Sequence, residues 1–251
     1  MRVEEINPYN SEGEKEQQIE EMFDSIAPAY DFMNTAMAFG LHKTWRNKAL
    51  TATLNFLKPI SPYKSLDILD IATGTGDVAI KMAQLFPRAK VTGIDLSEGM
   101  LAQARKKLND LSFDIKSRIA FGKGNSLMLP FHDNSFDIVT VAYGVRNFSD
   151  LKKGLAEIRR VIKPEGVLCI IELSCPKGKL TAPLYRFYSQ KIIPIIGRFV
   201  SKDKKAYSYL PESIAACPQG EEMAALLHEA GFKNVEWKPL TFGAVTYYIS
   251  R

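Results

Sequence analysis

The first 60 residues combine a polar stretch with a single helical pattern of apolar positions. Residues 1–13 are polar and acidic, and we expect a flexible arm there. Beyond them, apolar residues recur three and four positions apart, which is typical of one face of a helix. These residues are Ile19, Met22, Phe23, Ile26, Tyr30 and Met33. The pattern predicts a helical lid over residues 14–60.

From Leu66 onward, short runs rich in β-branched residues replace the helical spacing. Five such runs predict strands near residues 65–72, 89–96, 118–124, 136–144 and 166–173. Amphipathic segments at 99–110 and 151–163 lie between them and predict helices. Alternation of this kind is typical of parallel strands joined by crossover helices. We therefore expect an α/β fold with a Rossmann-like, doubly wound and mostly parallel sheet, whose core spans residues 65–175.

The last third of the chain breaks this alternation and then closes it. Residues 176–218 form an aromatic, basic and irregular stretch that is too long for a simple connection, so we expect an insertion there. Residues 219–251 predict a closing helix ended by Gly231, followed by a pair of strands. With 251 residues in all, the chain is expected to form a single domain.

The composition of the chain limits the classes of protein to which it can belong. The net charge of +5 is modest, and 46% of residues are hydrophobic, enough for a substantial core. The three cysteines include no CxxC pair, so we expect a reduced cytosolic protein without a metal site. The acidic N-terminus is unlike a secretory signal, and no apolar stretch approaches 18 residues. We expect neither export nor a membrane span.

The turn after the first predicted strand is the strongest candidate for a ligand site. It reads DIATGTGD from Asp70 to Asp77, and its glycines, Gly74 and Gly76, let the backbone approach a ligand. Asp95 closes the second strand, at the interval expected for a carboxylate that accepts both hydroxyls of a ribose. After the third strand, Asn125 and Ser126 offer side chains that could read an adenine edge.

NAD and S-adenosylmethionine (SAM) both contain such an adenosine, so other residues must separate them. Asp70 can face the positively charged sulfonium and amino group of SAM, whereas a pyrophosphate has no use for that carboxylate. No Tyr-x-x-x-Lys pair of a short-chain dehydrogenase occurs in the chain. The order of glycine turn, Asp95 and Asn125 resembles the class I methyltransferases, with Ala72 at the position of their first glycine. The cofactor we expect is SAM.

Four further segments point to a narrower family. They are YDFMN at 30–34 followed by His42 and Trp45, GVRN at 144–147, RVIKPEG at 160–166 continuing to Ser174, and YSYLPES at 207–213. Together they resemble the menaquinone and ubiquinone biosynthesis C-methyltransferases from about residue 18 to 242. Ala38 replaces the family's usual serine and Glu165 its usual glycine. By this resemblance Thr75, Asp95, Asn125 and Ser126 would contact SAM.

The resemblance implies methylation of a ring carbon in a polyprenylated quinol, with demethylmenaquinol as the favoured substrate. Arg146 would stabilise the phenolate or organise a proton-accepting water, and Asn147 and Tyr30 would hydrogen-bond to the quinol. A benzoquinol substrate, another small molecule and a non-catalytic SAM-binding module stay open as alternatives. His42 and Trp45 are equally compatible with packing. The sequence leaves the oligomeric state open.

Positive charge is concentrated in one segment of the chain, which indicates where a partner could bind. Residues 177–205 carry eight lysines and arginines against Asp203 alone, interleaved with aromatic and aliphatic residues. Such a segment could dock reversibly on an anionic membrane surface, or act only as a substrate lid. We therefore expect a cytoplasmic protein that is peripheral on the inner face of the membrane if this segment docks there, and the alternative of a substrate lid alone stays open. No motif of a base methyltransferase is present, so we expect no nucleic-acid partner.

Overall fold

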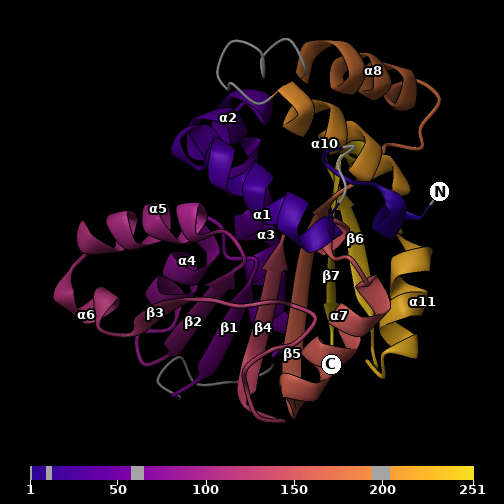
Figure 1. The fold of residues 1–251 in the computed structure, drawn as a ribbon. Helices are drawn as coiled ribbons and strands as arrows, with labels where there is room; N and C mark the ends of the chain where they lie inside the picture. The colour runs from indigo at the N-terminus through magenta and orange to yellow at the C-terminus, as the bar shows by residue number, and fades with distance from the viewer. Residues whose placement is uncertain (1, 10–12, 58–64, 194–203) are drawn as a thin grey trace.

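One seven-stranded sheet organises the computed structural model, which describes residues 2–9, 13–57, 65–193 and 204–251 (Figure 1). The strands are β1 (Asp67–Ile71), β2 (Lys90–Asp95), β3 (Ile119–Lys123), β4 (Phe136–Ala142), β5 (Ile162–Leu173), β6 (Glu236–Leu240) and β7 (Val245–Ser250). They follow in the order β3-β2-β1-β4-β5-β7-β6. Pairs among β1 to β5 are parallel, whereas β7 is antiparallel to β5 and β6. The predicted doubly wound, mostly parallel sheet is confirmed.

Helices join the parallel strands and cover both faces of the sheet. These helices are α4 (Asp77–Leu85), α5 (Glu98–Asn109), α6 (Phe113–Lys116) and α7 (Leu151–Val161), and α11 (Glu221–Glu229) precedes the β6-β7 pair. Ser97 begins α5 by accepting a hydrogen bond from the amide of Met100, and Asp150 does the same for α7 at Lys153. The strand order reverses between β1 and β4, which is where ligands of such folds bind.

Alternate residues of each strand feed two separate cores. Leu69 and Val139 pack on the face covered by α7 and α11, and their neighbours Ile68 and Ile138 pack on the face covered by α3 (Leu41–Phe56) and α4. All four are fully buried. This alternation follows from the two-residue period of a strand. Because both faces are covered, the middle residues of the central strands β1 and β4 are mostly apolar and buried.

The N-terminal helices are η1 (Val3–Glu5), α1 (Lys15–Ile26), η2 (Ala27–Ala29), α2 (Tyr30–Met37) and α3 (Leu41–Phe56), so the helices predicted over 14–60 are present. Of these, α1 and α2 lie above the carboxyl edge of the sheet (Figure 1), whereas α3 packs on one of its faces. The flexible arm predicted for residues 1–13 is wrong for residues 2–9. Val3 and Ile6, three positions apart, are both buried, and Lys15 donates a 2.5 Å hydrogen bond to the carbonyl of Val3. Residues 1 and 10–12 lie outside the described part.

The insertion after β5 is helical where the sequence indicated an irregular stretch. It contains α8 (Thr181–Phe187), the π-helix η4 (Tyr188–Ile192) and α10 (Lys204–Ala216), which lie beside α2 in Figure 1. Leu184 and Phe187 are 70% and 59% exposed, so the polar and apolar positions of α8 do not separate into a clear stripe. Residues 194–203 of the basic segment lie outside the described residues. In the part of the chain described, no helix is long and apolar enough to cross a membrane.

Candidate functional site

Two adjoining cavities open at the carboxyl edge of the sheet. The smaller, of about 660 Å³, lies at the reversal between β1 and β4, and we call it the switch-point cavity. Four of the predicted cofactor residues and two of the predicted catalytic residues line it: Gly74, Asp95, Asn125, Ser126, Tyr30 and Asn147. The structure thus brings together side chains that are up to 117 positions apart in the sequence.

The glycine turn shapes the floor of this cavity. Gly74 and Gly76 both have positive φ, +55° and +81°, a region that favours glycine. A Cβ atom on Gly76 would lie 2.8 Å from the ring of Phe121 in β3, so the second glycine is also needed for space. Gly76 itself lines no part of the cavity. Its role is to turn the chain from β1 into α4.

Ala72 stands where the wider class has a first glycine, and the structure shows how it fits. Its φ is +52°, a conformation that an alanine adopts at a cost of about 1 kcal/mol. Gly144, which follows the neighbouring strand β4, lies directly beside it: a Cβ on Gly144 would be 2.6 Å from the Cβ of Ala72. The absence of a side chain at Gly144 therefore makes room for the methyl group of Ala72.

Asp95 lies at the end of β2 with its carboxylate on the cavity wall. Its two oxygens accept hydrogen bonds from the backbone amides of Gly74 (2.8 Å) and Ser97 (2.9 Å). Burial raises the pKa of this carboxyl to about 6, against the opposing effect of those amides. The two amides fix the orientation of the carboxylate, and its remaining lone pairs are free to accept from a ligand.

Asp70 and Thr75 do not line the cavity. Asp70 is 1% exposed, and its carboxylate accepts 2.6 Å hydrogen bonds from the hydroxyls of Thr73 and Thr140 beneath the turn. Burial raises its pKa to about 6. The structure therefore differs from the expectation that Asp70 faces a sulfonium group, because its oxygens are directed into the sheet.

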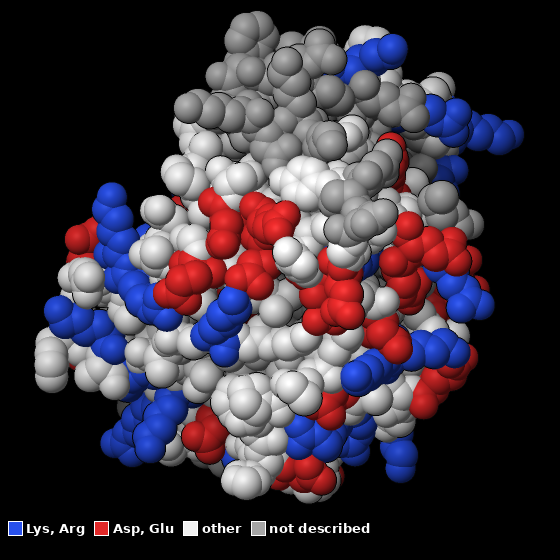
Figure 2. Space-filling view, viewed as in Figure 1, with Lys and Arg blue, Asp and Glu red and all other residues white. Residues whose placement is uncertain are grey.

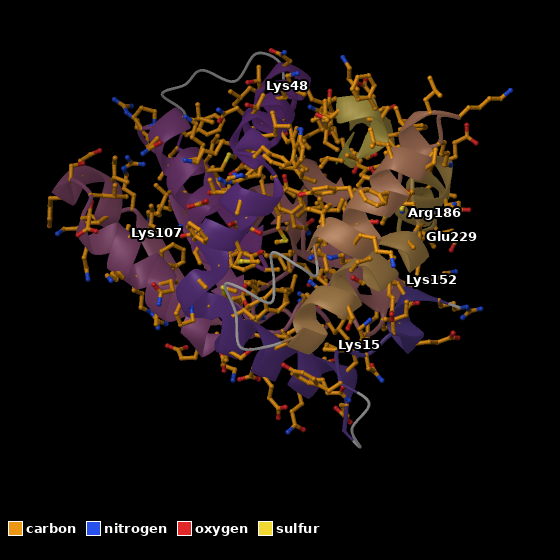
Figure 3. The ribbon with its side chains drawn as sticks, turned by 90° about the horizontal axis from the view of Figure 1, so that it is seen from above. Lys15, Lys48, Lys107, Lys152, Arg186 and Glu229 are labelled. Atoms are coloured by element: carbon orange, nitrogen blue, oxygen red, sulfur yellow. The ribbon has the colours of Figure 1, made fainter. Side chains whose placement is uncertain are left out.

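Thr75 faces the N-terminal helices instead of the cavity. Its hydroxyl donates to Asp31 of α2 (2.7 Å) and accepts from the ammonium of Lys107 of α5 (2.8 Å). Lys107 also pairs with Asp31 and Asp77 at 2.6 Å each, and it is labelled in Figure 3, which looks down on this edge. The turn is thus tied to α2 and α5 through Thr75.

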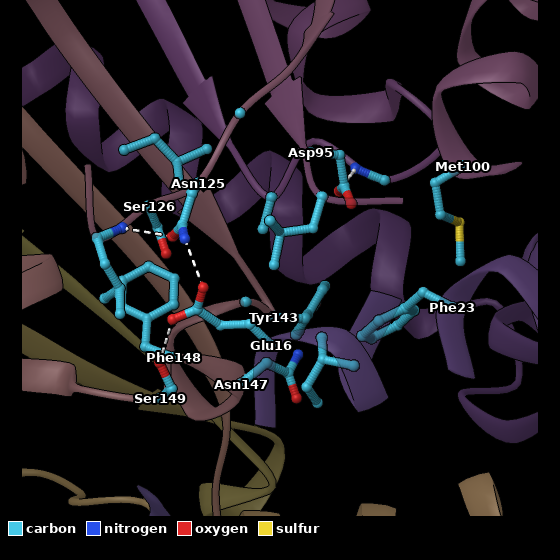
Figure 4. A pocket seen from close by; sticks show the side chains of 18 of the residues that line it. Glu16, Phe23, Asp95, Met100, Asn125, Ser126, Tyr143, Asn147, Phe148 and Ser149 are labelled. Atoms are coloured by element: carbon cyan, nitrogen blue, oxygen red, sulfur yellow. Dashed lines mark hydrogen bonds between the residues drawn. The ribbon is translucent and has the colours of Figure 1, made fainter. Parts of the chain in front are cut away.

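Glu16 is a cavity residue that sequence reasoning missed. Its two carboxylate oxygens accept 2.6 Å hydrogen bonds from the side-chain amide of Asn125 and the hydroxyl of Ser149. Glu16 therefore bridges the loops after β3 and β4 (Figure 4). Ile19 and Phe23, three and seven positions further along α1, also line the cavity. Their helical spacing was visible in the sequence, but nothing local showed that this face meets the sheet edge.

Further carboxylates of α1 continue the same line of contacts. Glu20 pairs with Lys123 at the end of β3, and Asp24 accepts hydrogen bonds from the hydroxyl of Ser97 (2.5 Å) and the amide of Gly99 (2.8 Å). Glu16, Glu20 and Asp24 are each one helical turn apart, and Figure 2 shows acidic side chains gathered across the middle of this face, where α1 runs. We call these three the carboxylate row. It fastens α1 across the loops that follow β2, β3 and β4.

The larger hollow, of about 1440 Å³, lies between the N-terminal helices and the helical insertion, and we call it the apolar cavity. Most of its wall is aliphatic or aromatic, including Met22, Ile26, Met33, Met37, Leu173, Ile193, Leu210 and Ile214. Phe23, Tyr30 and Tyr143 belong to the walls of both cavities. A molecule in one cavity can therefore contact a molecule in the other at this shared boundary.

Arg146 and Asn147, both predicted to act on the quinol, face different cavities. Arg146 lies in η3 (Val145–Asn147) on the wall of the apolar cavity, and its guanidinium pairs with Glu172 of β5 at 2.8 Å. Burial, the largest single cause, would lower the pKa of Arg146, but Glu172 together with Tyr30 and Tyr209 outweighs it, so that pKa is raised. Asn147 lines the switch-point cavity, and its side-chain oxygen accepts a 3.0 Å hydrogen bond from the hydroxyl of Tyr209.

Two residues of the YDxMN…H…W pattern also reach the apolar cavity. His42 and Trp45 lie on α3, are 7% and 8% exposed and line its wall. The indole of Trp45 donates to the hydroxyl of Thr241 at 2.7 Å, which fixes the ring. Across the ranges that the structure describes, no group of three or more His, Cys, Asp and Glu side chains could hold a metal ion.

The chain is similar to known methyltransferases along almost its whole length. The family model described as the ubiE/COQ5 methyltransferase family matches residues 11–251. A demethylmenaquinone methyltransferase of Bacteroides fragilis is 43% identical over 245 residues, 98% of this chain and 96% of that protein. The ubiquinone/menaquinone biosynthesis C-methyltransferase UbiE of Geotalea uraniireducens is 40% identical over 237 residues, 94% and 97% of the two chains.

Solved structures agree on the fold at much lower identity. A SAM-dependent methyltransferase from Thermotoga maritima has a TM-score of 0.61 at 18% identity, covering 92% of this chain and 98% of that one. The [4+2]-cyclase SpnF has a TM-score of 0.65 at 17% identity, covering 94% and 95%. Because a cyclase is named among these neighbours, the fold by itself does not fix the reaction.

Proposed function

Because the chain belongs to the ubiE/COQ5 methyltransferase family, it is a SAM-dependent methyltransferase, and we propose that its substrate is a polyprenylated quinol. Demethylmenaquinol is the favoured substrate, since the relatives from Bacteroides fragilis and Porphyromonas gingivalis are both named demethylmenaquinone methyltransferases. The alternative is a benzoquinol of ubiquinone biosynthesis, which the name of the Geotalea relative also covers. The methyl group is transferred to a ring carbon.

The observation that carries this proposal is the shared boundary between a polar cavity and an apolar one. SAM is assigned to the switch-point cavity, where Asp95 has lone pairs for the ribose hydroxyls and where Asn125 and Ser126, in the loop after β3, line the wall. The prenylated ring is assigned to the apolar cavity. Tyr30 and Tyr143, on both walls, then lie where the sulfonium methyl meets the ring.

The chemistry needs alignment more than acid or base strength. A phenol with a pKa near 10 is ionised about 0.1% of the time at pH 7, so ionisation costs about 4 kcal/mol. Fixed alignment of two reactants contributes as much as about 7–11 kcal/mol. Arg146 is 5% exposed and charged, so it favours a phenolate oxygen nearby. Tyr30 and Asn147 are proposed to hydrogen-bond to the quinol or to the groups that hold it.

Product analysis with purified protein tests the assignment. We expect SAM and a reduced, short-chain demethylmenaquinol to give a product with one added methyl group on the ring carbon, identified by tandem mass spectrometry. A prenylated methoxybenzoquinol run in parallel should react more slowly. Faster methylation of the benzoquinol would overturn the choice of ring. Methylation on oxygen, or of neither quinol, would overturn the function.

We also propose that the insertion docks the enzyme on an anionic membrane surface. Lys177, Lys179, Arg186 and Lys191 are all exposed, and no acidic residue lies between residues 177 and 193. Exposed apolar side chains accompany them: Phe39, Leu180, Leu184 and Phe187. Prenylated quinols are held in membranes by their chains, so such docking would place the apolar cavity close to its substrate.

Vesicle flotation tests the docking. At about 1 kcal/mol per basic residue, alanine at both Lys177 and Lys179 should weaken binding to anionic vesicles about 30-fold. The matched control removes Lys90 and Lys116, two exposed lysines towards the opposite edge of the sheet, and should leave binding unchanged. Equal partitioning of the unmodified protein onto neutral and anionic vesicles would reject electrostatic docking.

A further inference from the structure

The wall of the apolar cavity carries polar atoms that no protein group satisfies. In the described part of the chain, five buried side-chain atoms lack a hydrogen-bond partner, and three belong to residues of this wall. They are Nδ1 of His42, the hydroxyl of Tyr143 and Nε of Arg146. Buried polar atoms without partners are costly and uncommon. All three are covered by protein atoms, so a ligand would reach them only when these side chains shift towards the cavity. A quinol ring brings two hydroxyls.

The side chains on the wall of the apolar cavity differ in whether they can accept a proton at neutral pH. Burial raises the pKa of each tyrosine that lines the cavity, so all of them stay protonated at neutral pH: Tyr30, Tyr143, Tyr185, Tyr188 and Tyr209. Arg46 and Arg146 are cations and have no lone pair to offer. No aspartate or glutamate is among the described wall residues. His42 is therefore the wall side chain, in the described part, that can accept a proton at neutral pH.

The surroundings of His42 keep its imidazole neutral. Burial is the main cause of a pKa below the ordinary value, and the neighbouring charges of Arg46 and Lys43 on α3 act in the same direction. Asp77 of α4 and Asp31 of α2 oppose them without reversing the shift. His42 also lies in the first turn of α3, where the helix dipole disfavours a cation. A neutral imidazole has one unprotonated ring nitrogen, so His42 can accept a hydrogen bond from a ligand in the cavity that it lines.

Arg46 relates His42 to the boundary that the two cavities share. Arg46 is one helical turn beyond His42 on α3 and lines the same cavity. Its charge lowers the pKa of both Tyr30 and Tyr143, the two tyrosines common to the two cavities, partly offsetting the effect of burial. The turn of α3 that carries His42 and Arg46 therefore shares a cavity wall with these two tyrosines, and the charge of Arg46 reaches both of them.

We propose that His42 accepts the hydroxyl proton of the bound quinol as the ring carbon takes the methyl group. This inference rests on the proposed function. The O–H electron pair flows into the ring, the ring carbon forms a bond to the methyl group, and the C–S bond breaks with its pair going to sulfur. The proton moves to the imidazole. Loss of the ring C–H proton to water then restores the aromatic ring as a phenolate, which takes a proton back from the imidazolium. The products are the methylated quinol, S-adenosylhomocysteine and one proton, and His42 is neutral again.

A base with a lowered pKa is sufficient for this role. As the methyl group bonds to the ring, the hydroxyl oxygen gains positive character and its proton becomes far more acidic than that of a free phenol. The base therefore does not have to ionise a phenol before the reaction starts. Arg146 can stabilise charge on an oxygen, but as a cation it cannot take the proton. The two residues thus have separate parts in one step.

Turnover measured against pH tests the role of His42. The variants are His42→Asn and His42→Gln, and the matched control is His132→Gln, which changes an exposed histidine on the loop before β4. With a reduced, singly prenylated demethylnaphthoquinol, the unmodified enzyme should lose kcat below the pKa of His42, on the acid side of 6.5, because a protonated imidazole cannot accept. Both His42 variants should show kcat lowered 100-fold or more, with the acidic limb absent and SAM affinity and thermal midpoint unchanged.

Nuclear magnetic resonance provides a readout that does not depend on turnover. The ring signals of His42, assigned by their loss in His42→Gln, should titrate below the ordinary histidine pKa. They should also shift when the methylated quinol product binds. A His42→Asn enzyme with near-normal kcat and an unchanged acidic limb would overturn the inference, as would ring signals insensitive to product. If the unmodified enzyme methylates no quinol, the proposed function fails first, and that outcome is separate.

Discussion

The buried ion pair between Arg146 and Glu172 gives a direct test of how the apolar cavity is held together. The two side chains are 6% and 4% exposed, and they meet at 2.8 Å. The same carboxylate accepts the amide of Leu173 at 2.8 Å. Glu172→Gln removes the negative charge, keeps the shape of the side chain and leaves the guanidinium charge without its counterion.

The expected loss follows from that burial. Breaking a buried pair by removing one partner costs about 3–5 kcal/mol. The glutamine oxygen still accepts one hydrogen bond worth about 1 kcal/mol, so about 2–4 kcal/mol should be lost from the free energy of unfolding. For a chain of this length, each kcal/mol lowers the thermal midpoint by about 2–4 °C. Glu172→Gln should therefore melt about 4–16 °C lower.

Thermal and urea denaturation, followed by circular dichroism, measure this loss. The matched control is Glu229→Gln, which breaks the 2.7 Å pair with Lys152 on the surface, where the side chains are 59% and 69% exposed (Figure 3). Exposed pairs are worth about 0–1 kcal/mol, so this control should melt within a few degrees of the unmodified protein. If both variants melted alike, the pair would not be desolvated and the reasoning would be refuted.

Three further predictions concern the two cavities. Asp95→Ala should weaken SAM binding tenfold or more in calorimetric titration, because each lost hydrogen bond to a carboxylate is worth about 1.5–3 kcal/mol. The affinity of the unmodified protein should fall as the pH drops through about 6, where Asp95 takes up a proton and accepts fewer hydrogen bonds. Arg146→Lys and Tyr30→Phe should both slow methyl transfer while SAM affinity stays near normal. Lysine lacks the planar donor fork of arginine, and phenylalanine lacks the hydroxyl that would bond to the quinol. Gly76→Ala should cost about 1–3 kcal/mol in urea denaturation because its Cβ would meet Phe121.

Each of these has an outcome that contradicts it. Unchanged SAM affinity in Asp95→Ala, or a flat pH dependence, would remove that carboxylate from the cofactor site. Full activity in both Arg146→Lys and Tyr30→Phe would remove those residues from the reaction. Gly122→Ala is the control for Gly76→Ala, because a Cβ at Gly122 meets nothing within 4 Å. Equal stability of the two alanine variants would contradict the steric argument.

Local sequence pattern predicted most of the sheet and the polar part of the site. Strand runs, the glycine turn and Asp95 are recognisable because each depends on residues adjacent in sequence. The packing of Val3 depends instead on contacts with a core that is assembled mainly from residues after 65, and the sequence indicated a free arm. The helices of the insertion were missed because their apolar side chains are partly on the outside, so no stripe marks them.

In the candidate site, too, some residues could be predicted from the local sequence and others could not. Asn125 and Ser126 could be predicted from their place after a strand, and they do line the switch-point cavity. Asp70 was expected to face the ligand, yet the hydroxyls of Thr73 and Thr140 occupy its oxygens, and partners 3 and 70 positions away leave no common local signal. Glu16 reaches the cavity only because α1 crosses the sheet edge, which no spacing within the helix reveals.

The carboxylate row on α1 has a consequence for the catalytic cycle. Residues of this one helix wall both cavities, with Glu16 on the polar side, Met22 on the apolar side and Phe23 on both. Its contacts with the loops after β2, β3 and β4 are spaced one turn apart, so a rigid α1 would break them together when it lifts. Spent cofactor and methylated product would then leave during the same opening, and each turnover would end in a single, concerted exchange of both ligands.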